Sequence, residues 1–212
     1  MKDRGILIVV SGFSGSGKGT LMKELLARYP DTYALSISAT TRSPREGEED
    51  GREYFFVTKE EFEKMIAKGD LIEYAKYVEN YYGTPKNYVE QKLEEGKDVI
   101  LEIEIQGALK VKKAFPDTLL LFVTPPSATE LKSRLVGRGT ETMDVIESRM
   151  NRACEEAEGM DSYDYLVVND DLDACVEEMH SIIRSEHRKS SRNRAFMESM
   201  KEELIRLKQS EE

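Results

Sequence analysis

A glycine-rich segment near the start of the chain combines residue types that bind phosphate groups. It reads SGFSGSGKGT over residues 11–20, where glycines let backbone N–H groups approach a ligand and Lys18 adds a full positive charge. An apolar run at residues 6–10 precedes it, and good helix formers follow at residues 21–28. A buried strand, a turn and a helix N-terminus in this order predict a phosphate-binding loop, because unpaired N–H groups and the helix dipole attract anions.

The residue after Lys18 departs from the usual form of such a loop. Ser or Thr commonly follows the lysine and faces a magnesium ion, whereas this chain has Gly19 and then Thr20. We therefore assign the metal-facing hydroxyl to Thr20, and the alternative for the segment as a whole is a glycine-rich turn that binds nothing. The residues expected to bind a nucleoside triphosphate here are Gly12, Phe13, Ser14, Gly15, Ser16, Gly17, Lys18, Gly19 and Thr20.

A second group of residues suited to phosphate lies on a polar stretch further along the chain. Arg42 and Arg45 are separated only by a serine and a proline, and Tyr54 and Tyr82 belong to nearby aromatic segments. Guanidinium groups grip phosphate through two hydrogen bonds, and tyrosine hydroxyls add neutral donors. Two anion sites in one chain predict two phosphorylated ligands held face to face, as direct phosphoryl transfer requires.

Further arginines stand where a flexible joint is expected. Arg134 and Arg138 are four residues apart, on one face of a helix that runs into Gly137–Gly139, and Arg149 lies on the next helix. Each arginine alone would suit a surface ion pair, but the group beside the glycines favours a role at the transferred phosphate.

The composition bounds the class of protein. The 212 residues carry a net charge of −10, which argues against general nucleic-acid binding, and no apolar run approaches the ~20 residues of a membrane helix. Cys154 and Cys175 form no metal-binding pair, and His180 and His187 have no partner base in sequence, so we interpret these residues as structural or surface groups. We see no secretory signal and expect a cytoplasmic protein.

Strand-like and helix-like segments alternate behind the loop, which predicts a parallel sheet covered on both faces. Strands are expected at residues 33–38, 98–105, 118–124 and 165–168, and helix-forming sequence follows the last three of them. A β-rich block from Ser38 to about Thr84 interrupts the alternation. From about residue 186 the chain is highly charged, with one apolar stripe at helical spacing, comprising Phe196, Met200, Leu204 and Leu207. This stripe predicts a helix that either rests on its own domain or joins two subunits.

Several motifs resemble those of guanylate kinases. They are Thr41-Arg42-x-x-Arg45-x-x-Glu48-x-x-Gly51-x-x-Tyr54-x-Phe56, Asn80-Tyr81-Tyr82-Gly83, Glu104-x-Gln106-Gly107, Gly137-Arg138-Gly139 and Val168-Asn169-Asp170-Asp171. The resemblance covers roughly residues 5–187.

The resemblance implies an α/β fold with a phosphate-loop, three-layer core and a parallel sheet, a small β-rich GMP-binding insertion and a helical lid. It divides the chain into a kinase-like domain at residues 4–187 and a charged helical tail at 188–212. Within the domain, the core comprises residues 4–37 and 97–187, with a lid at about 125–155, and the insertion spans about 38–96.

The resemblance also implies phosphorylation of GMP to GDP by ATP, with Mg²⁺, as part of purine metabolism. The implied catalytic residues are Lys18, Arg134, Arg138 and Arg149, and Asn169 is a candidate adenine contact. The implied GMP-binding residues are Ser38, Arg42, Arg45, Glu48, Tyr54, Glu73, Tyr82, Thr84 and Glu104. The partners expected are ATP and GMP, with dGMP as a further acceptor, no nucleic acid or membrane, and a possible homodimer.

The hydrogen-bonding groups of guanine are consistent with this set of GMP-binding residues. Guanine offers adjacent N1–H and amino donors to carboxylates at Glu73 and Glu104, whereas adenine would leave a carboxylate unpaired. The family more often has Asp at Glu102 and Glu104, so details of base and metal contacts are open. Two alternatives are kinases of ribose bisphosphates, which would not need this set, and scaffold modules, which lack an intact phosphate loop.

Overall fold

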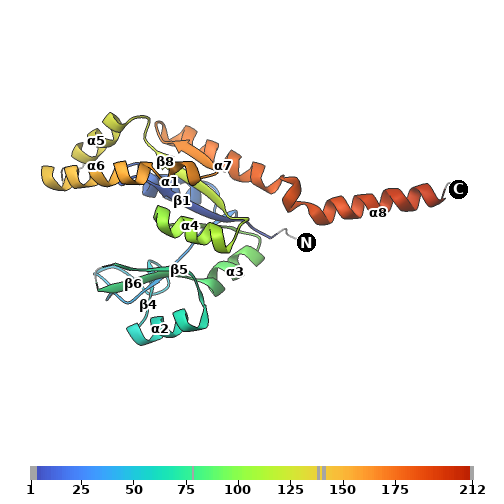
Figure 1. Cartoon of the computed structure of the whole chain (residues 1–212), viewed down its shortest axis with the longest axis horizontal. Coiled ribbons are helices and arrows are strands. Elements are labelled where there is room, and N and C mark those ends of the chain that lie inside the picture. The colour runs from blue at the N-terminus through green and yellow to red at the C-terminus, as the bar shows by residue number, and fades with distance from the viewer. Residues whose placement is uncertain (1–3, 78, 138, 140–141, 211–212) are drawn as a thin grey trace.

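The computed structural model describes residues 4–77, 79–137, 139 and 142–210. Its centre is a five-stranded parallel sheet with strand order β2-β7-β1-β8-β9 (Figure 1). The strands are β1 (Leu7–Gly12), β2 (Tyr33–Leu35), β7 (Asp98–Glu102), β8 (Leu119–Thr124) and β9 (Tyr165–Val168). Because the strands are parallel, their carboxyl ends meet at one edge, which is where α/β sheets of this kind bind ligands.

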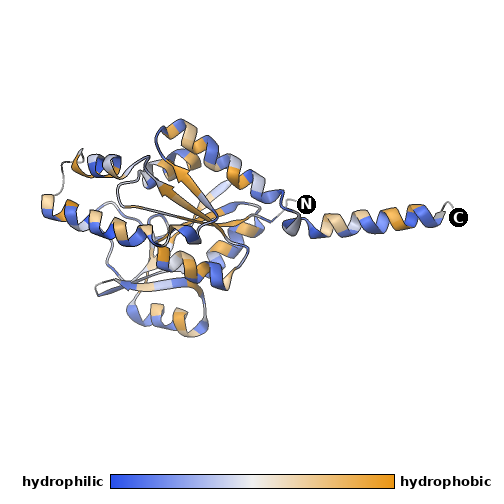
Figure 2. Cartoon of the chain, turned by 45° about the horizontal axis from the view of Figure 1, so that its top comes forward, coloured by the Kyte–Doolittle hydropathy of each residue, from blue (hydrophilic) through white to orange (hydrophobic). Residues whose placement is uncertain are grey.

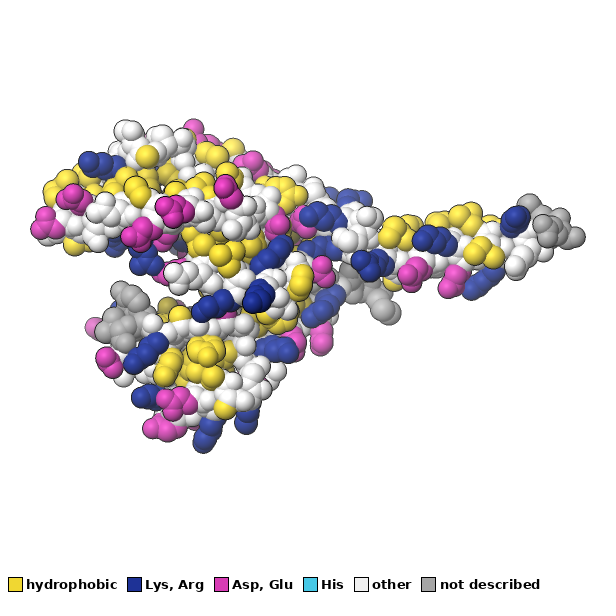
Figure 3. Space-filling model, in the orientation of Figure 1, with side chains coloured by type: hydrophobic (Ala, Val, Ile, Leu, Met, Phe, Trp, Pro, Cys, Tyr) yellow, Lys and Arg dark blue, Asp and Glu magenta, His cyan; other side chains and the backbone are white. Residues whose placement is uncertain are grey.

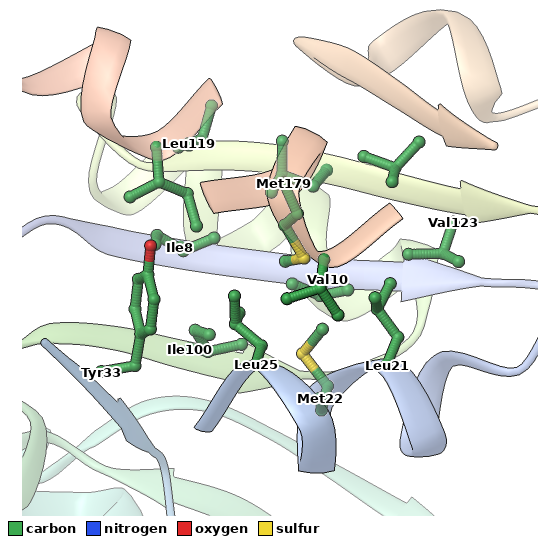
Figure 4. Packing of buried hydrophobic residues seen from close by; sticks show 14 of the residues in the cluster. Ile8, Val10, Leu21, Met22, Leu25, Tyr33, Ile100, Leu119, Val123 and Met179 are labelled. Carbon is green, nitrogen blue, oxygen red and sulfur yellow. The ribbon is translucent and has the colours of Figure 1, made fainter. Parts of the chain in front are cut away.

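The apolar strands are buried on both faces, as the uninterrupted hydrophobic runs predict. Ile8 and Val10 of β1 pack on one side, against α1 (Lys18–Arg28) and α7 (Leu172–His187), as Figure 4 shows. Val9 packs on the other side, with α3 (Lys86–Glu94) and α4 (Ile105–Ala114). Alternate side chains thus bind two helical layers to one sheet, and Figure 2 shows the central strands as strongly hydrophobic.

Two helices lie beside the carboxyl edge of the sheet. They are α5 (Ala128–Gly137) and α6 (Met143–Ala157), which pack through Leu131, Leu135 and Ile146 onto Phe13 of the glycine-rich loop and onto β8. The expected lid helices are therefore in direct contact with the loop.

A second, mixed sheet forms below the core in Figure 1. Its order is β4-β3-β6-β5, with bounds β3 (Ser38–Thr40), β4 (Tyr54–Phe56), β5 (Leu71–Tyr77) and β6 (Asn80–Pro85). Helix α2 (Lys59–Lys68) covers it, and Thr58 and Glu61 form the capping box that starts this helix. The buried Phe62 of α2 stacks on the ring of Tyr81, with centroids 5.2 Å apart, and so fixes the helix to the sheet.

Two expected strands are shorter than predicted. Residues 33–38 are not one strand: β2 ends at Leu35, the Ser36 N–H still reaches the Ile100 carbonyl at 2.8 Å, and β3 begins at Ser38 in the second sheet. The strand predicted at 98–105 ends at Glu102, and α4 begins at Ile105. Residues 33–38 keep one pattern although the chain passes from the first sheet to the second, and residues 98–105 keep one although it passes from a strand to a helix. The apolar pattern alone therefore does not mark either boundary.

The C-terminal segment leaves the core as a projecting helix (Figure 1). Short 3₁₀ turns occur at Met160–Ser162 and Ser190–Arg192, and α8 spans Arg194–Ser210. Phe196, Met200, Leu204 and Leu207 are 43–66% exposed, so the stripe does not rest on its own domain. Among the described residues, no helix is long and apolar enough to cross a membrane.

Both histidines are structural, as expected. His180 stacks on Tyr29 with centroids 3.8 Å apart and bonds the Tyr33 hydroxyl at 2.6 Å. His187, at the end of α7, lies 2.8 Å from the buried Asp98 carboxylate.

Candidate active site

The glycine-rich loop has a backbone that only glycine adopts easily. Gly15 and Gly17 have φ values of +98° and +85°. A Cβ on Gly15 would lie 2.8 Å from the Leu135 side chain, and one on Gly17 would lie 2.5 Å from the Asn169 amide nitrogen. Leu135 and Asn169 therefore pack closely against the loop. The N–H groups of the loop are available to a ligand at the start of α1.

Residues from distant parts of the chain hold the loop carbonyl of Ser16. The Asn169 amide donates to it at 2.8 Å, and the Arg134 guanidinium donates at 3.4 Å. Asn169 thus supports the loop with the amide that we expected to face adenine. Among the residues that the structure describes, the buried Ser16 hydroxyl has no hydrogen-bond partner, which is consistent with a polar ligand in the loop.

Lys18 extends from the first turn of α1 toward the end of β7. Its ammonium lies 3.3 Å from the Glu102 carboxylate, and both groups line a cavity of about 420 Å³ in front of the loop. Thr20 lines the same cavity. Strand β7 therefore supplies an anionic partner that keeps the lysine at the mouth of the loop.

The oxygen groups in this cavity fit a magnesium ion. Mg²⁺ prefers one or two carboxylates or hydroxyls together with substrate phosphates, rather than a protein cage. The Glu102 carboxylate and the Thr20 hydroxyl are such groups. The described part of the chain contains no cluster of three or more His, Cys, Asp or Glu residues placed for a metal.

Arg42 is held by a forked ion pair on the second sheet. Its two terminal nitrogens donate to the two Glu48 oxygens at 2.9 and 3.0 Å, and the same carboxylate accepts from the Arg45 N–H at 2.7 Å. These hydrogen bonds hold the pKa of the Glu48 carboxyl below its usual range and raise the pKa of Arg42. Glu48 thus orients Arg42 and the Arg45 loop, while the Arg45 residue itself is exposed.

Two tyrosines lie beside this guanidinium. Arg42 lies over the Tyr54 ring, 5.3 Å from its centroid, and the neighbouring Tyr82 is one of the groups that raise the pKa of the same guanidinium. The two tyrosine rings meet edge to face, 6.1 Å apart. The structure thus brings Arg42, Tyr54 and Tyr82 together.

A polar row crosses the second sheet next to this cluster. The buried Thr84 on β6 donates its hydroxyl to Glu73 on β5 at 2.9 Å. Ser38 of β3 lies one position beyond the Ala39–Gly83 pair, which puts it across from Thr84. Burial raises the pKa of the Glu73 carboxyl, and the Thr84 hydrogen bond acts in the opposite direction. The row combines hydroxyl donors with a carboxylate acceptor.

Glu104 belongs to the core and immediately precedes α4. Its carboxylate lies 2.7 Å from the Arg152 guanidinium on α6. The sequence analysis did not identify Arg152, because nothing distinguishes it from the other charged residues of α6.

Helix α6 also reaches the loop. The Arg149 guanidinium donates to the Ser14 hydroxyl, one turn before Arg152. A cavity of about 500 Å³ connects these groups and is lined by Lys18, Glu104, Arg149 and Arg152 among others. Figure 3 shows the molecule hollowed between α6 and the second sheet. Arg138, the remaining expected lid residue, lies outside the described residues.

The fold, the glycine-rich loop and the arginine–tyrosine cluster define an α/β protein of the phosphate-loop class. Comparison with protein-family models matches residues 4–186 to guanylate kinase. The chain belongs to the guanylate kinase family.

Relatives support this assignment over nearly the whole chain. The guanylate kinase of Bacillus subtilis (strain 168) is 55% identical over 192 residues, covering 91% of this chain and 94% of that protein. The guanylate kinase of Enterococcus faecalis (strain ATCC 700802 / V583) is 56% identical over 187 residues, covering 88% and 92%. The crystal structure of guanylate kinase from Anaplasma phagocytophilum matches with a TM-score of 0.69 at 30% identity, covering 91% of each chain.

Proposed function

We propose that this protein is a guanylate kinase that transfers the terminal phosphoryl group of ATP to GMP, giving ADP and GDP. The observation that carries the proposal is the presence of two clusters suited to phosphate, a glycine-rich loop with Lys18 on the core and an arginine–tyrosine cluster on the second sheet. Membership of the family supports the same reaction.

The phosphate loop holds the donor. N–H groups of residues 12–20 and the Lys18 ammonium bind the outer phosphates of ATP, and the backbone of Gly15 and Gly17 makes this approach possible. Thr20 and Glu102 would hold Mg²⁺ together with the ATP phosphates, and the bound ion would supply positive charge beside the transferred group. Arg134, Arg138 and Arg149 add positive charge from the lid, and Asn169 keeps the loop in shape.

The second sheet holds the acceptor. Glu48 takes only part of the donor capacity of Arg42, so the guanidinium keeps N–H groups for the GMP phosphate, beside Arg45, Tyr54 and Tyr82. Ser38 and Thr84 provide hydroxyls for the guanine O6, and Glu73 and Glu104 accept from its N1–H and amino group.

Transfer needs no general base, because the acceptor phosphate is already an anion. The residues of the two sites act by aligning the nucleotides and by neutralising charge on the phosphoryl group during its transfer. Closure of the lid excludes water that would otherwise accept the phosphoryl group.

The proposal also divides the chain into parts. We propose a core at residues 4–37 and 97–187, an insertion at 38–96 and a tail at 188–212, and the two sheets and α8 support this division.

The proposal also covers the setting of the enzyme. We place it in the cytoplasm, in purine nucleotide metabolism and GMP recycling, with dGMP as a second acceptor and no nucleic-acid or membrane partner. The exposed apolar face of α8 supports a homodimer.

A coupled assay with MgATP and a panel of acceptors tests the proposal. GMP and dGMP should be phosphorylated, whereas AMP, UMP and ribose bisphosphate should react at least about 10²-fold more slowly in kcat/KM. Turnover of ribose bisphosphate above that of GMP, or no turnover of any acceptor, would overturn it.

A further inference from the structure

The ion pair between Arg152 and Glu104 joins the lid helix to the acceptor side of the cavity. The Arg152 Nη2 lies 2.7 Å from Glu104 Oε1. The Nε of the same guanidinium donates to Glu156 Oε1 at 3.1 Å, one turn further along α6. Glu156 therefore fixes the direction of the guanidinium, and the guanidinium in turn fixes Glu104.

Glu104 needs such a partner to hold one conformation. Its side chain is 73% exposed, and it precedes α4 without forming a side-chain cap. A carboxylate on a long, exposed side chain otherwise samples several rotamers, and ordering it on binding costs affinity. Arg152 supplies this order before any ligand arrives.

The two acceptor carboxylates share one pattern. Thr84 donates to Oε1 of Glu73, and the Arg152 Nη2 lies 2.7 Å from Oε1 of Glu104. In each carboxylate a described protein group engages Oε1, and we assign Oε2 to a ligand. Guanine presents two adjacent donors on one edge, N1–H and the exocyclic amine. These two donors match in number the two Oε2 atoms, one from Glu73 and one from Glu104.

The order of groups along the guanine edge assigns the contacts. O6 lies next to N1, and the exocyclic amine lies on the far side of N1. Ser38, Thr84 and Glu73 follow one another across the second sheet, whereas Glu104 comes from the core. With O6 at the hydroxyls, N1–H faces Glu73 and the amine faces Glu104.

We propose that Arg152 is a positioning residue that holds Glu104 to accept the exocyclic amine of guanine, and so sets the preference for GMP over 6-oxopurine nucleotides that lack this amine. The inference rests on the proposed function, since it concerns the same acceptor site. It makes Arg152 act through Glu104, without touching the substrate.

Inosine monophosphate provides the test, because its base keeps O6 and N1–H but lacks the amine. In Arg152→Ala, the KM for GMP should rise about 3- to 10-fold with kcat and the KM for ATP unchanged. The kcat/KM for inosine monophosphate should stay as in the wild type, so the preference for GMP falls by the same factor. Arg152→Lys, which keeps a charged donor, should restore part of the preference.

Two further variants test whether the change in GMP preference depends on the pair of Arg152 and Glu104. Arg206→Ala removes an exposed arginine from an ion pair with Glu202 on α8, at 3.4 Å, and should change neither acceptor. In a Glu104→Ala background, adding Arg152→Ala should have no further effect on the KM for GMP.

The inference is overturned if Arg152→Ala weakens GMP and inosine monophosphate equally, since this would be a general effect on the lid, or if it changes neither. These results are distinct from failure of the proposed function, which would show as absence of GMP phosphorylation by the wild-type protein.

Discussion

At the scale of single residues, the site is built from charged groups that already have partners. Lys18 faces Glu102, Arg42 faces Glu48 and Arg152 faces Glu104. These carboxylates hold the cations in place in an acidic protein whose net charge of −10 would otherwise repel nucleotides. Local arrangement, rather than overall charge, therefore makes the cavity suitable for two anionic ligands.

Replacing the loop lysine should abolish turnover without unfolding the protein. Lys18→Ala removes the mobile charge at the outer phosphates, so we expect kcat to fall by at least about 10²-fold in the coupled assay. The thermal midpoint should stay near that of the wild type, because Lys18 lies at the mouth of a cavity. Lys92→Ala, which removes a lysine paired with Glu95 at 2.8 Å on the surface, is the matched control. Near-normal kcat in Lys18→Ala would exclude this lysine from the mechanism.

The buried carboxyl of Glu73 should make GMP binding sensitive to acid. Burial raises its pKa, so protonation begins at a higher pH than for an ordinary carboxyl and removes the acceptor that guanine N1–H needs. The KM for GMP should therefore rise as pH falls toward this raised pKa, and the KM for ATP should not.

Glu73→Gln tests this assignment directly. The variant should lose preference for GMP over AMP and should show a flatter pH dependence of the KM for GMP. Because an ionised carboxylate with a raised pKa destabilises the folded state above its ordinary pKa, the amide should also increase the free energy of unfolding near neutral pH. An unchanged GMP-to-AMP ratio would mean that the base is recognised elsewhere.

At the scale of elements, the sequence predicted most strands and helices of the core, because buried parallel strands are continuous apolar runs. It did not separate β2 from β3, since Tyr33–Ser38 reads as one alternating segment although Leu35 and Ser38 belong to different sheets. The change of sheet depends on hydrogen-bond partners far away in sequence, such as the Ile100 carbonyl that receives the Ser36 N–H. Local pattern carries no information about such partners.

The same limit explains what was missed in the site. The glycine-rich loop and the stretch from Thr41 to Phe56, which carries Arg42, Arg45 and Tyr54, are local motifs, so they could be predicted from the sequence. The support of Ser16 by Asn169, 153 residues away, and the pairing of Glu104 with Arg152 are set by packing between elements. Neither contact has a fixed spacing from which it could be predicted.

A buried carboxylate joins three elements at the edge of the sheet opposite the site. Asp98, the first residue of β7, accepts from the Ile6 N–H at 2.8 Å and lies 2.8 Å from His187 at the end of α7. Asp98→Ala should lower the free energy of unfolding by about 1–3 kcal/mol, because it leaves a buried N–H unpaired. Denaturant titration should show a smaller loss in Asp98→Asn, whose amide oxygen still accepts. The exposed Asp31→Ala is the control, and equal stability of all three variants would contradict this role.

At the scale of the whole molecule, α8 is an arm separate from the catalytic layers. It starts after His187, at the edge of the sheet where Asp98 lies, whereas the phosphate loop lies at the opposite edge. The segment that joins α7 to α8, which we call the root of the helix, is held by side-chain contacts. The buried Glu186 contacts Lys189 and Arg192, and the Asn193 amide donates to the His187 carbonyl at 2.7 Å. Figure 1 shows the helix extending from the core, and Figure 3 shows hydrophobic side chains at its surface.

Removing this arm should separate assembly from catalysis. A chain ending at Asn193 should keep the kcat and both KM values of the full chain, because the root contacts are retained. In analytical ultracentrifugation over a range of concentrations, the full chain should associate and the shortened chain should sediment as a monomer. Association that survives the truncation, or a full chain that is monomeric throughout, would contradict a dimer formed through α8.

We propose that the phosphate loop and the arginine–tyrosine cluster bind two nucleotides end to end. Isothermal titration with a compound that joins adenosine and guanosine through five phosphates tests this arrangement, since such a molecule fills both sites at once. We expect one molecule bound per chain, at least about 10²-fold more tightly than ATP or GMP alone, with weaker binding in both Lys18→Ala and Arg42→Ala. Affinity no better than that of ATP, or binding that is unaffected by Arg42→Ala, would contradict it.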